Sequence, residues 1–372
     1  MLERLEGQGA DDAEKTYQMG RYIRALAYER AIPLQGTFEL TPLCNLNCKM
    51  CYVHLNAEEL QASRRRLLTG EQWIRIMEQA VHEGMMYATL TGGEALTHPE
   101  FDEIYLYLQS QGIEITVKSN GLLLDDKRMA YFKAHPPREI AISLYGSNDD
   151  VYERVTGKRC YQEVMNAIQR VKSSKIALNV AITPNRHMKD DIGSVTALLD
   201  SMDIHYGVNS SLIQPRKETG RELDDQDLTT EEYIELYKEQ AVIHGQPLTP
   251  SCDQDIPMKP SSAAPSIGLP CGAGRNSFSI HWDGKMYPCL SLPDVGADVT
   301  SIPFATAWEC VHAAVEKHPF PGECMTCELR AICTPCVVAH APDGYAEHAN
   351  PVLCKRARRM LEEGLVHFDR TE

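Results

Sequence analysis

The chain has 372 residues, of which 43% are hydrophobic and 24% are charged, enough for one large domain and a smaller one. Its net charge of -15 argues against sequence-independent nucleic-acid binding, because neutralising phosphates requires a basic surface. No run of about 18 apolar residues occurs, and the N-terminus lacks an apolar signal core. We therefore expect a cytoplasmic protein without a membrane partner.

The first half of the chain alternates between two kinds of segment. After an amphipathic helix predicted over residues 11–33, strands are expected at 37–41, 86–91, 113–118, 139–145, 176–182 and 204–213. Helices are expected between them, at 70–84, 99–111, 125–134, 148–172 and 187–202. Strands separated by helices pair in parallel through right-handed crossovers. The pattern predicts an α/β fold, a partial (β/α)6 barrel.

The second half follows a different pattern. The polar stretch 215–228 is predicted to be a linker, followed by a helix at 229–244 and a Pro/Ser-rich loop at 247–270. Beyond Cys271 cysteines are dense and helix–strand alternation fades, which is typical of a small metal-stabilised domain. We predict an N-terminal helical segment (1–36), a barrel (37–214), a linker with a helix (215–270) and a Cys-rich domain (271–372).

The chain contains thirteen cysteines, which in a cytosolic protein indicate metal ligands or catalytic thiols rather than disulfides. Ten of them form two groups. The first contains Cys44, Cys48 and Cys51, and the second contains Cys271, Cys289, Cys324, Cys327, Cys333, Cys336 and Cys354. Cys160, Cys252 and Cys310 stand alone. Cys310 lies in an amphipathic helical pattern, so we expect it to be a packing residue, and Cys160 to be a core or surface thiol.

The first cysteine group follows the first predicted strand immediately. Its loop therefore lies at the carboxyl edge of the sheet, where the active sites of α/β proteins assemble. A 4Fe-4S cluster usually takes four Cys ligands, so three leave one iron open to a substrate-like ligand such as S-adenosylmethionine. The alternative is a structural zinc site completed by His54, although such sites usually pair two-Cys knuckles.

The spacing of Cys44, Cys48 and Cys51 resembles the CX3CX2C signature of the radical S-adenosylmethionine (radical SAM) superfamily. Gly92-Gly93-Glu94, after the second strand, resembles the GGE motif of that family, which receives the methionine ammonium. The resemblance also implies that further residues lie against the cofactor: Ser119, Asn120 and Ser143 near its ribose and carboxylate, Arg154 at its carboxylate, and Met50 beside its adenine.

The second cysteine group resembles the SPASM extension of radical SAM enzymes, which holds up to two auxiliary 4Fe-4S clusters. Asp283-Gly284 predicts a tight hairpin within it. The resemblance assigns Cys324, Cys327, Cys333 and Cys354 to an outer cluster, and Cys271, Cys289 and Cys336 to an inner one. Either Cys252 or Cys310 completes the inner set, or one iron stays open. A zinc ribbon is the alternative reading of the two CXXC pairs.

The resemblance implies an enzyme that cleaves S-adenosylmethionine to a 5′-deoxyadenosyl radical and abstracts hydrogen from a peptide or protein residue. Thioether or carbon–carbon crosslinking and epimerisation are expected products. A flavodoxin- or ferredoxin-type protein would donate electrons, entering through the outer clusters or directly at the first one. Since only 36 residues precede the first predicted strand, leader recognition is expected to come from a separate leader-binding protein or from the surface of this one.

Three alternative functions stay open at this point: a sulfatase-type formylglycine maturase, a radical SAM enzyme acting on a non-peptide small molecule, and a zinc-stabilised interaction module without catalysis. The pattern does not name a general base. Tyr145, Asp149, Asp283 and His281 are candidate pocket residues, for which we expect structural roles.

Overall fold

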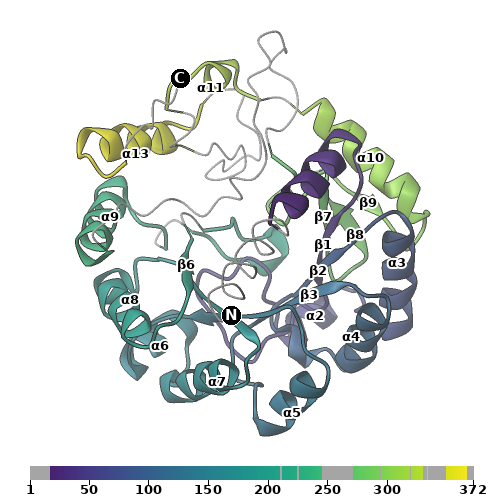
Figure 1. The fold of residues 1–372 in the computed structure, drawn as a ribbon, viewed down its shortest axis with the longest axis horizontal. Coiled ribbons are helices and arrows are strands. Elements are labelled where there is room, and N and C mark those ends of the chain that lie inside the picture. Colours follow the sequence, from purple (N-terminus) through teal and green to yellow (C-terminus); the bar gives the residue numbers. More distant parts are fainter. Residues whose placement is uncertain are drawn as a thin grey trace, which may run out of the picture.

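The structure is a computed structural model that describes residues 17–209, 212–223, 226–244, 271–292, 295–318, 320–329, 333 and 349–366. Cys252 and Cys336 lie outside this part of the chain. Figure 1 shows a curved sheet surrounded by helices, with α11 (Gly322–Met325) and α13 (Pro351–Glu362) beyond the ring. In the residues described, no helix is long and apolar enough to cross a membrane.

The described strands form one sheet in the order β6-β5-β4-β3-β2-β1-β7-β8-β9. Strands β1 to β6 are parallel: Gln35–Glu39, Tyr87–Thr91, Glu114–Ser119, Glu139–Leu144, Ala177–Ile182 and Tyr206–Val208. On the other edge of β1 lies β7 (Ser277–Ile280), also parallel to it, followed by antiparallel β8 (Lys285–Tyr287) and β9 (Ala297–Asp298). The sheet thus continues across the predicted boundary at residue 271.

Helices cover the outer face of the sheet (Figure 1). In chain order they are α3 (Gly70–His82), α4 (Phe101–Ser110), α5 (Asp126–Ala134), α6 (Asp149–Thr156), α7 (Tyr161–Ser173), α8 (Ile192–Ser201), α9 (Thr230–His244) and α10 (Phe304–Glu316). The short helix α2 (Ala57–Ala62) lies inside this ring and buries none of its residues. Residues 17–29 are also helical. The Trp308 indole donates to the Ala31 carbonyl at 2.7 Å, which ties this N-terminal segment to α10. The alternation of strands and helices confirms the predicted partial α/β barrel.

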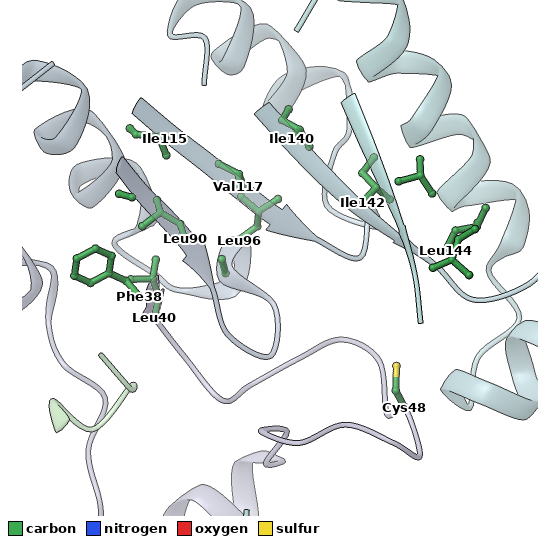
Figure 2. Close-up of a cluster of buried hydrophobic side chains, with 14 of the residues drawn as sticks. Phe38, Leu40, Cys48, Leu90, Leu96, Ile115, Val117, Ile140, Ile142 and Leu144 are labelled. Atoms are coloured by element: carbon green, nitrogen blue, oxygen red, sulfur yellow. The ribbon is translucent and has the colours of Figure 1, made fainter. Parts of the chain in front are cut away.

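The core lies between the sheet and these helices (Figure 2). The Phe38 ring packs edge-on against Trp73 of α3 and Phe278 of β7, with centroids 6.0 Å and 5.8 Å apart. Burying a side chain of this size stabilises the fold by about 1.5–3 kcal/mol. Because strand side chains alternate between faces, Thr37 and Glu39 point to the barrel interior when Phe38 faces the helices. The same alternation places Lys118, Ser143 and His281 on the interior face.

Of four predictions about local structure, two need correction and two are confirmed. The helix predicted over 148–172 is two helices, because α6 ends at Gly157, whose φ of +74° is unfavourable for other residues. Cys310, predicted to pack in the core, is exposed on α10. Cys160 is fully buried, so the core reading of this thiol is confirmed. The hairpin predicted at Asp283-Gly284 joins β7 to β8, with Gly284 at φ +84°.

Candidate functional site

The loop that follows β1 carries the first cysteine group, beyond the strand ends (Figure 2). Two backbone hydrogen bonds tie it to the end of α6: Asn47 N donates to the Thr156 carbonyl and Lys49 N to the Val155 carbonyl, both at 3.0 Å. Within the loop, Cys51 N donates to the Cys48 carbonyl at 3.1 Å. The early end of α6 at Gly157 is therefore what brings a helix terminus against the loop.

The three thiols of this loop lie close enough to influence one another. Burial raises the pKa of Cys44 to about 12, and the charges of Glu94 and Cys51 add to the rise. Burial and the other two thiols raise the pKa of Cys48, while the Arg221 guanidinium opposes the rise. Without a metal, Cys44 and Cys48 hold their protons at neutral pH. A cationic metal centre would displace the protons and compensate the buried thiolates.

Glu94 links the ends of β2 and β3 beside this loop. Its carboxylate is buried and accepts hydrogen bonds from Asn120 N at 2.8 Å, Ser119 Oγ at 3.1 Å and Leu96 N at 3.1 Å. Burial raises the pKa of Glu94 to about 7 despite these donors. A carboxylate has about four acceptor positions, so one remains for the ammonium of a ligand.

The two glycines before Glu94 allow the loop to approach the end of β2. A Cβ on Gly92, at φ +150°, would lie 2.4 Å from the Thr41 carbonyl oxygen, and one on Gly93 would lie 2.5 Å from that of Leu43. The Gly93 and Glu94 amides donate to the Thr41 and Leu43 carbonyls at 2.7 Å and 2.9 Å. No side chain fits between these segments, so the positions require glycine.

Asn120 connects this carboxylate with the thiols. Its side-chain amide donates to Asn45 Oδ1 at 2.6 Å and approaches Cys44 Sγ at 3.5 Å, while its backbone amide donates to Glu94. Tyr145, which follows β4, also lies near the loop: burial and the Cys48 thiol raise its pKa, and a hydrogen bond with the Ser143 hydroxyl opposes the rise. The structure therefore brings the polar ends of β2, β3 and β4 to the cysteine loop.

The remaining residues predicted to contact the cofactor differ in placement. Met50 is buried in the main core beside the thiols. Arg154 is exposed on α6. Burial lowers the pKa of His187, and the charges of Lys49, Arg154 and Arg186 add to that shift. Arg154 therefore lies at the cysteine loop, and no described contact joins it to Glu94 or Asn120.

Two arginines in the stretch 215–228, which we predicted as a linker, reach this site. Arg221 donates through Nη1 to the Cys48 carbonyl and through Nη2 to Asn47 Oδ1. Arg216 N donates to the Tyr52 carbonyl at 3.1 Å. The segment therefore holds the cysteine loop as well as connecting two parts of the chain, and nothing in its polar sequence pointed to this role.

A buried polar group occupies the barrel interior below the loop. Arg216 Nη2 donates to Glu39 Oε2 at 2.6 Å and to His281 Nε2 at 3.0 Å, joining β1 to β7. Burial and the adjacent Arg216 charge lower the pKa of His281 to about 2, so this ring is neutral. The other candidate pocket residues have structural contacts: Asp149 accepts from Tyr161 N at 2.9 Å, and Asp283 pairs with Arg65 at 3.1 Å.

Some of the C-terminal cysteines lie close to one another. Burial raises the pKa of Cys333 to about 11, and the thiols of Cys354, Cys324 and Cys327 contribute to the rise. Cys289 and Cys324 pack against one small apolar cluster formed by Ala273, Leu292, Val315 and Phe320. Cys271 is exposed. These contacts bring together the four thiols predicted to bind an outer cluster, whereas Cys336 of the inner set lies outside the described residues.

Two observations test whether the β1 loop fits an iron-sulfur cluster with S-adenosylmethionine. Three mutually coupled thiols provide a donor set for three irons, and the glycine cradle holds a buried carboxylate with spare acceptor capacity beside them. Among the residues described, no three His, Cys, Asp or Glu side chains surround the position of a single ion. The fit therefore rests on the donor chemistry and its polar surroundings.

Comparison with known proteins decides the family. Residues 38–192, which include the cysteine loop, Glu94 and Asn120, match the model of the radical SAM superfamily. Residues 38–192 are therefore a radical SAM domain. The chain is a radical SAM enzyme, and this domain implies a 4Fe-4S cluster and S-adenosylmethionine as cofactors.

Relatives of this radical SAM enzyme match it over most of its length. The antilisterial bacteriocin subtilosin biosynthesis protein AlbA of Bacillus subtilis (strain 168) is 24% identical over 333 residues, covering 82% of this chain and 69% of AlbA. The AdoMet-dependent heme synthase of Methanosarcina barkeri (strain Fusaro / DSM 804) is 21% identical over 318 residues, covering 80% of this chain and 89% of the synthase.

Solved structures share the fold of this radical SAM enzyme. The crystal structure of Streptococcus suis SuiB bound to S-adenosylmethionine matches with a TM-score of 0.65 at 14% identity, covering 87% of this chain and 77% of SuiB. SuiB bound to its precursor peptide SuiA matches with a TM-score of 0.63 at 15% identity, covering 87% and 76%. At these identities the likeness establishes the fold.

Proposed function

We propose that this radical SAM enzyme modifies a residue of a ribosomally made peptide or protein, using one catalytic and two auxiliary 4Fe-4S clusters. The observation that carries the proposal is the coupled set of Cys44, Cys48 and Cys51 against the buried carboxylate of Glu94. A peptide substrate is supported by two relatives, since AlbA acts in bacteriocin biosynthesis and SuiB binds a precursor peptide. Thioether formation, carbon–carbon crosslinking and epimerisation are the reactions we propose.

Residues of the loops after β1 and β2 would hold the two cofactors. Cys44, Cys48 and Cys51 would bind three irons, and Glu94 would hold the ammonium of S-adenosylmethionine. When bound, the pair supplies one-electron cleavage of S-adenosylmethionine and a carbon-centred radical. The chain itself would orient the substrate and exclude water. We assign this role to the barrel interior, where His281 is neutral and Glu39 is paired with buried Arg216.

We also propose the cluster ligands of the C-terminal part. Cys324, Cys327, Cys333 and Cys354 would hold the outer auxiliary cluster, which their mutual influence on Cys333 supports. Cys271, Cys289 and Cys336 would hold the inner one, with Cys252 as its fourth ligand or an open iron. Exposure of Cys310 on α10 makes that thiol the weaker candidate for this position.

Iron content tests the cluster assignment. Anaerobically reconstituted protein should hold about twelve irons per chain, and changing Cys44, Cys48 and Cys51 to Ala should leave about eight. The same variant should no longer convert S-adenosylmethionine to 5′-deoxyadenosine and methionine under a strong reductant. Zinc in place of iron, at about one ion per four thiolates, would contradict the proposal.

A second candidate substrate is a tetrapyrrole, favoured by the match to the heme synthase over 89% of that protein. The two candidates separate in one experiment. A peptide substrate, taken from short reading frames next to the gene, should stimulate 5′-deoxyadenosine formation and change in mass, whereas a heme precursor should do neither. The reverse result would replace the peptide with the tetrapyrrole.

A further inference from the structure

Lys118 is a charged residue on the inner face of the sheet. Its neighbours Ile115 and Val117 on β3 belong to the core between the sheet and the helices (Figure 2), so the alternation of side chains directs Lys118 to the barrel interior. Solvent reaches this side chain, yet burial of its charge lowers the pKa of Lys118. Both observations are typical of a cation that is accessible to small molecules from inside the barrel while protein surrounds it.

The register of the strands places Lys118 in a row of interior side chains. Lys118 pairs with Ala141 of β4, and its neighbour on the other side is Thr91 of β2, which pairs with Glu39 of β1. Adjacent strands are about 4.8 Å apart, so about 10 Å separates the backbones of Glu39 and Lys118. The side chains on both sides of Lys118 are therefore small and leave room for a ligand at its ammonium.

The other polar groups of this row already have partners. Glu39 pairs with Arg216 at 2.6 Å, and the ring of His281 is neutral. The charge of Glu139, at the start of β4, raises the pKa of Lys118 and so opposes the effect of burial. In the part of the chain that the structure describes, however, no carboxylate lies within 4 Å of the Lys118 ammonium.

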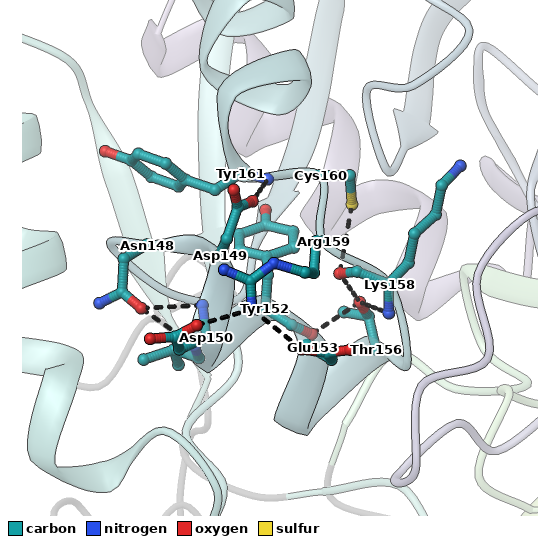
Figure 3. A network of polar contacts seen from close by, with 11 residues as sticks. Asn148, Asp149, Asp150, Tyr152, Glu153, Thr156, Lys158, Arg159, Cys160 and Tyr161 are labelled. Atoms are coloured by element: carbon teal, nitrogen blue, oxygen red, sulfur yellow. Dashed lines mark hydrogen bonds and ion pairs between the residues drawn. The ribbon is translucent and has the colours of Figure 1, made fainter.

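The carboxylates of the candidate pocket residues are engaged outside this row. Asp149 accepts from Tyr161 N at 2.9 Å in the α6–α7 network (Figure 3), and Asp283 pairs with Arg65 at 3.1 Å. A lysine that protein surrounds is normally paired with an anion. The anion that would match Lys118 therefore comes from outside the described chain, and a carboxylate is the group that an ammonium pairs with most readily in peptides.

We propose that Lys118 binds a carboxylate of the substrate and thereby positions the reacting residue in the barrel. The inference rests on the proposed function and deepens it, because it names a chemical group that the substrate carries. Asn120 follows about 7 Å farther along β3, where its backbone amide donates to Glu94 at 2.8 Å. A carboxylate held by Lys118 would keep the adjoining carbon atoms beside the proposed S-adenosylmethionine site. An acidic side chain or the C-terminus of the peptide supplies this group, and no covalent bond changes.

Titration of a peptide from the reading frames next to the gene into full-length, reconstituted protein with S-adenosylmethionine tests the proposal. Lys118→Met, which keeps the apolar stem, should raise the dissociation constant of the peptide about 10- to 100-fold, the value of one charge-assisted hydrogen bond. Lys118→Arg should retain most of the affinity. Lys133→Met, which removes an exposed cation from the last turn of α5, is the matched control and should bind the peptide as the wild type does.

Two further readouts exclude a purely structural role. Iron content and affinity for S-adenosylmethionine should be the same in Lys118→Met as in the wild type. The melting temperature of this variant should not fall, because the substitution also removes the cost of surrounding a charge with protein. A lower melting temperature together with lost iron would show that Lys118 supports the fold and would overturn the proposal.

Variants of the peptide identify the carboxylate. Each carboxylate is replaced by its amide in turn, the C-terminus included. One replacement should weaken binding to the wild type as much as Lys118→Met does, and the two changes together should cost no more than either alone. Losses that add for every carboxylate would overturn the proposal.

The same design separates the proposal from the peptide function. If a heme precursor binds the wild type and the peptide does not, the proposed peptide substrate is wrong. Lys118 is then supported if esterifying the propionates weakens binding to the wild type and leaves binding to Lys118→Met unchanged. Equal weakening of both proteins by the ester would overturn the role of Lys118.

Discussion

The raised pKa of Glu94 predicts how S-adenosylmethionine affinity depends on pH. Burial raises this pKa from 4.5 to about 7, so in the cofactor-free site the carboxyl is mostly neutral below that pH. The methionine ammonium pairs with the ionised form. Since about nine-tenths of a group with a pKa near 7 is ionised at pH 8 and about one-tenth at pH 6, affinity should fall about tenfold between them.

Isothermal titration of S-adenosylmethionine into reconstituted protein, repeated across this pH range, measures the effect. Glu94→Gln should lower affinity by about 10- to 100-fold, the value of one charge-assisted hydrogen bond, and should flatten the part of the pH profile that belongs to Glu94. Glu100→Gln is the matched control, because Glu100 is a nearby carboxylate that accepts from Gly70 N at 2.8 Å. Its profile should follow the wild type.

The raised pKa of Glu94 also affects the stability of the cofactor-free protein. A carboxyl whose pKa is raised on folding holds its proton longer in the folded chain, so stability falls as pH rises from about 4.5 to 7. For a buried group the loss of unfolding free energy is about 3 kcal/mol above pH 7, and Glu94→Gln should remove this loss.

The binding measurement gives the decisive outcome for both effects. A wild-type affinity for S-adenosylmethionine that is identical at pH 6 and pH 8, or that changes equally in Glu94→Gln, would refute the reasoning.

Three further variants test other parts of the site. Cys333→Ser should lower iron content by about four per chain while S-adenosylmethionine binding remains, whereas the buried Cys160, outside both groups, should tolerate Ser without iron loss. Gly93→Ala should lower the iron held by the first loop and reduce thermal stability, because its Cβ would lie 2.5 Å from the Leu43 carbonyl; Gly207→Ala, which meets no atom within 4 Å, should do neither. Glu39→Gln should lower the unfolding free energy, measured by calorimetry, by about 3–5 kcal/mol, because it removes the carboxylate that pairs with buried Arg216. Adding Arg216→Met should restore much of that stability.

Local sequence signals predicted the barrel closely. The strands expected at 86–91 and 139–145 are β2 (Tyr87–Thr91) and β4 (Glu139–Leu144), and the hairpin glycine lies where the Asp-Gly pair placed it. These features follow from alternation, chain length and turn chemistry, which act between neighbours in the sequence. The CX3CX2C loop and the glycine pair were visible for the same reason. The sequence could also group most of the cysteines without any knowledge of their positions in space.

Only the tertiary structure showed what surrounds the cysteine loop. Arg221 reaches Cys48 across 173 residues, and Arg216 reaches Glu39 across 177. The strand β7, from the Cys-rich part, pairs with β1 and places His281 in the barrel interior. A charged residue in a polar stretch has the same local signal whether it is solvated or buried against a distant partner. The composition and spacing of this chain therefore predicted its barrel and the groups into which its cysteines fall, whereas long-range contacts decided which charged residues are buried as a pair.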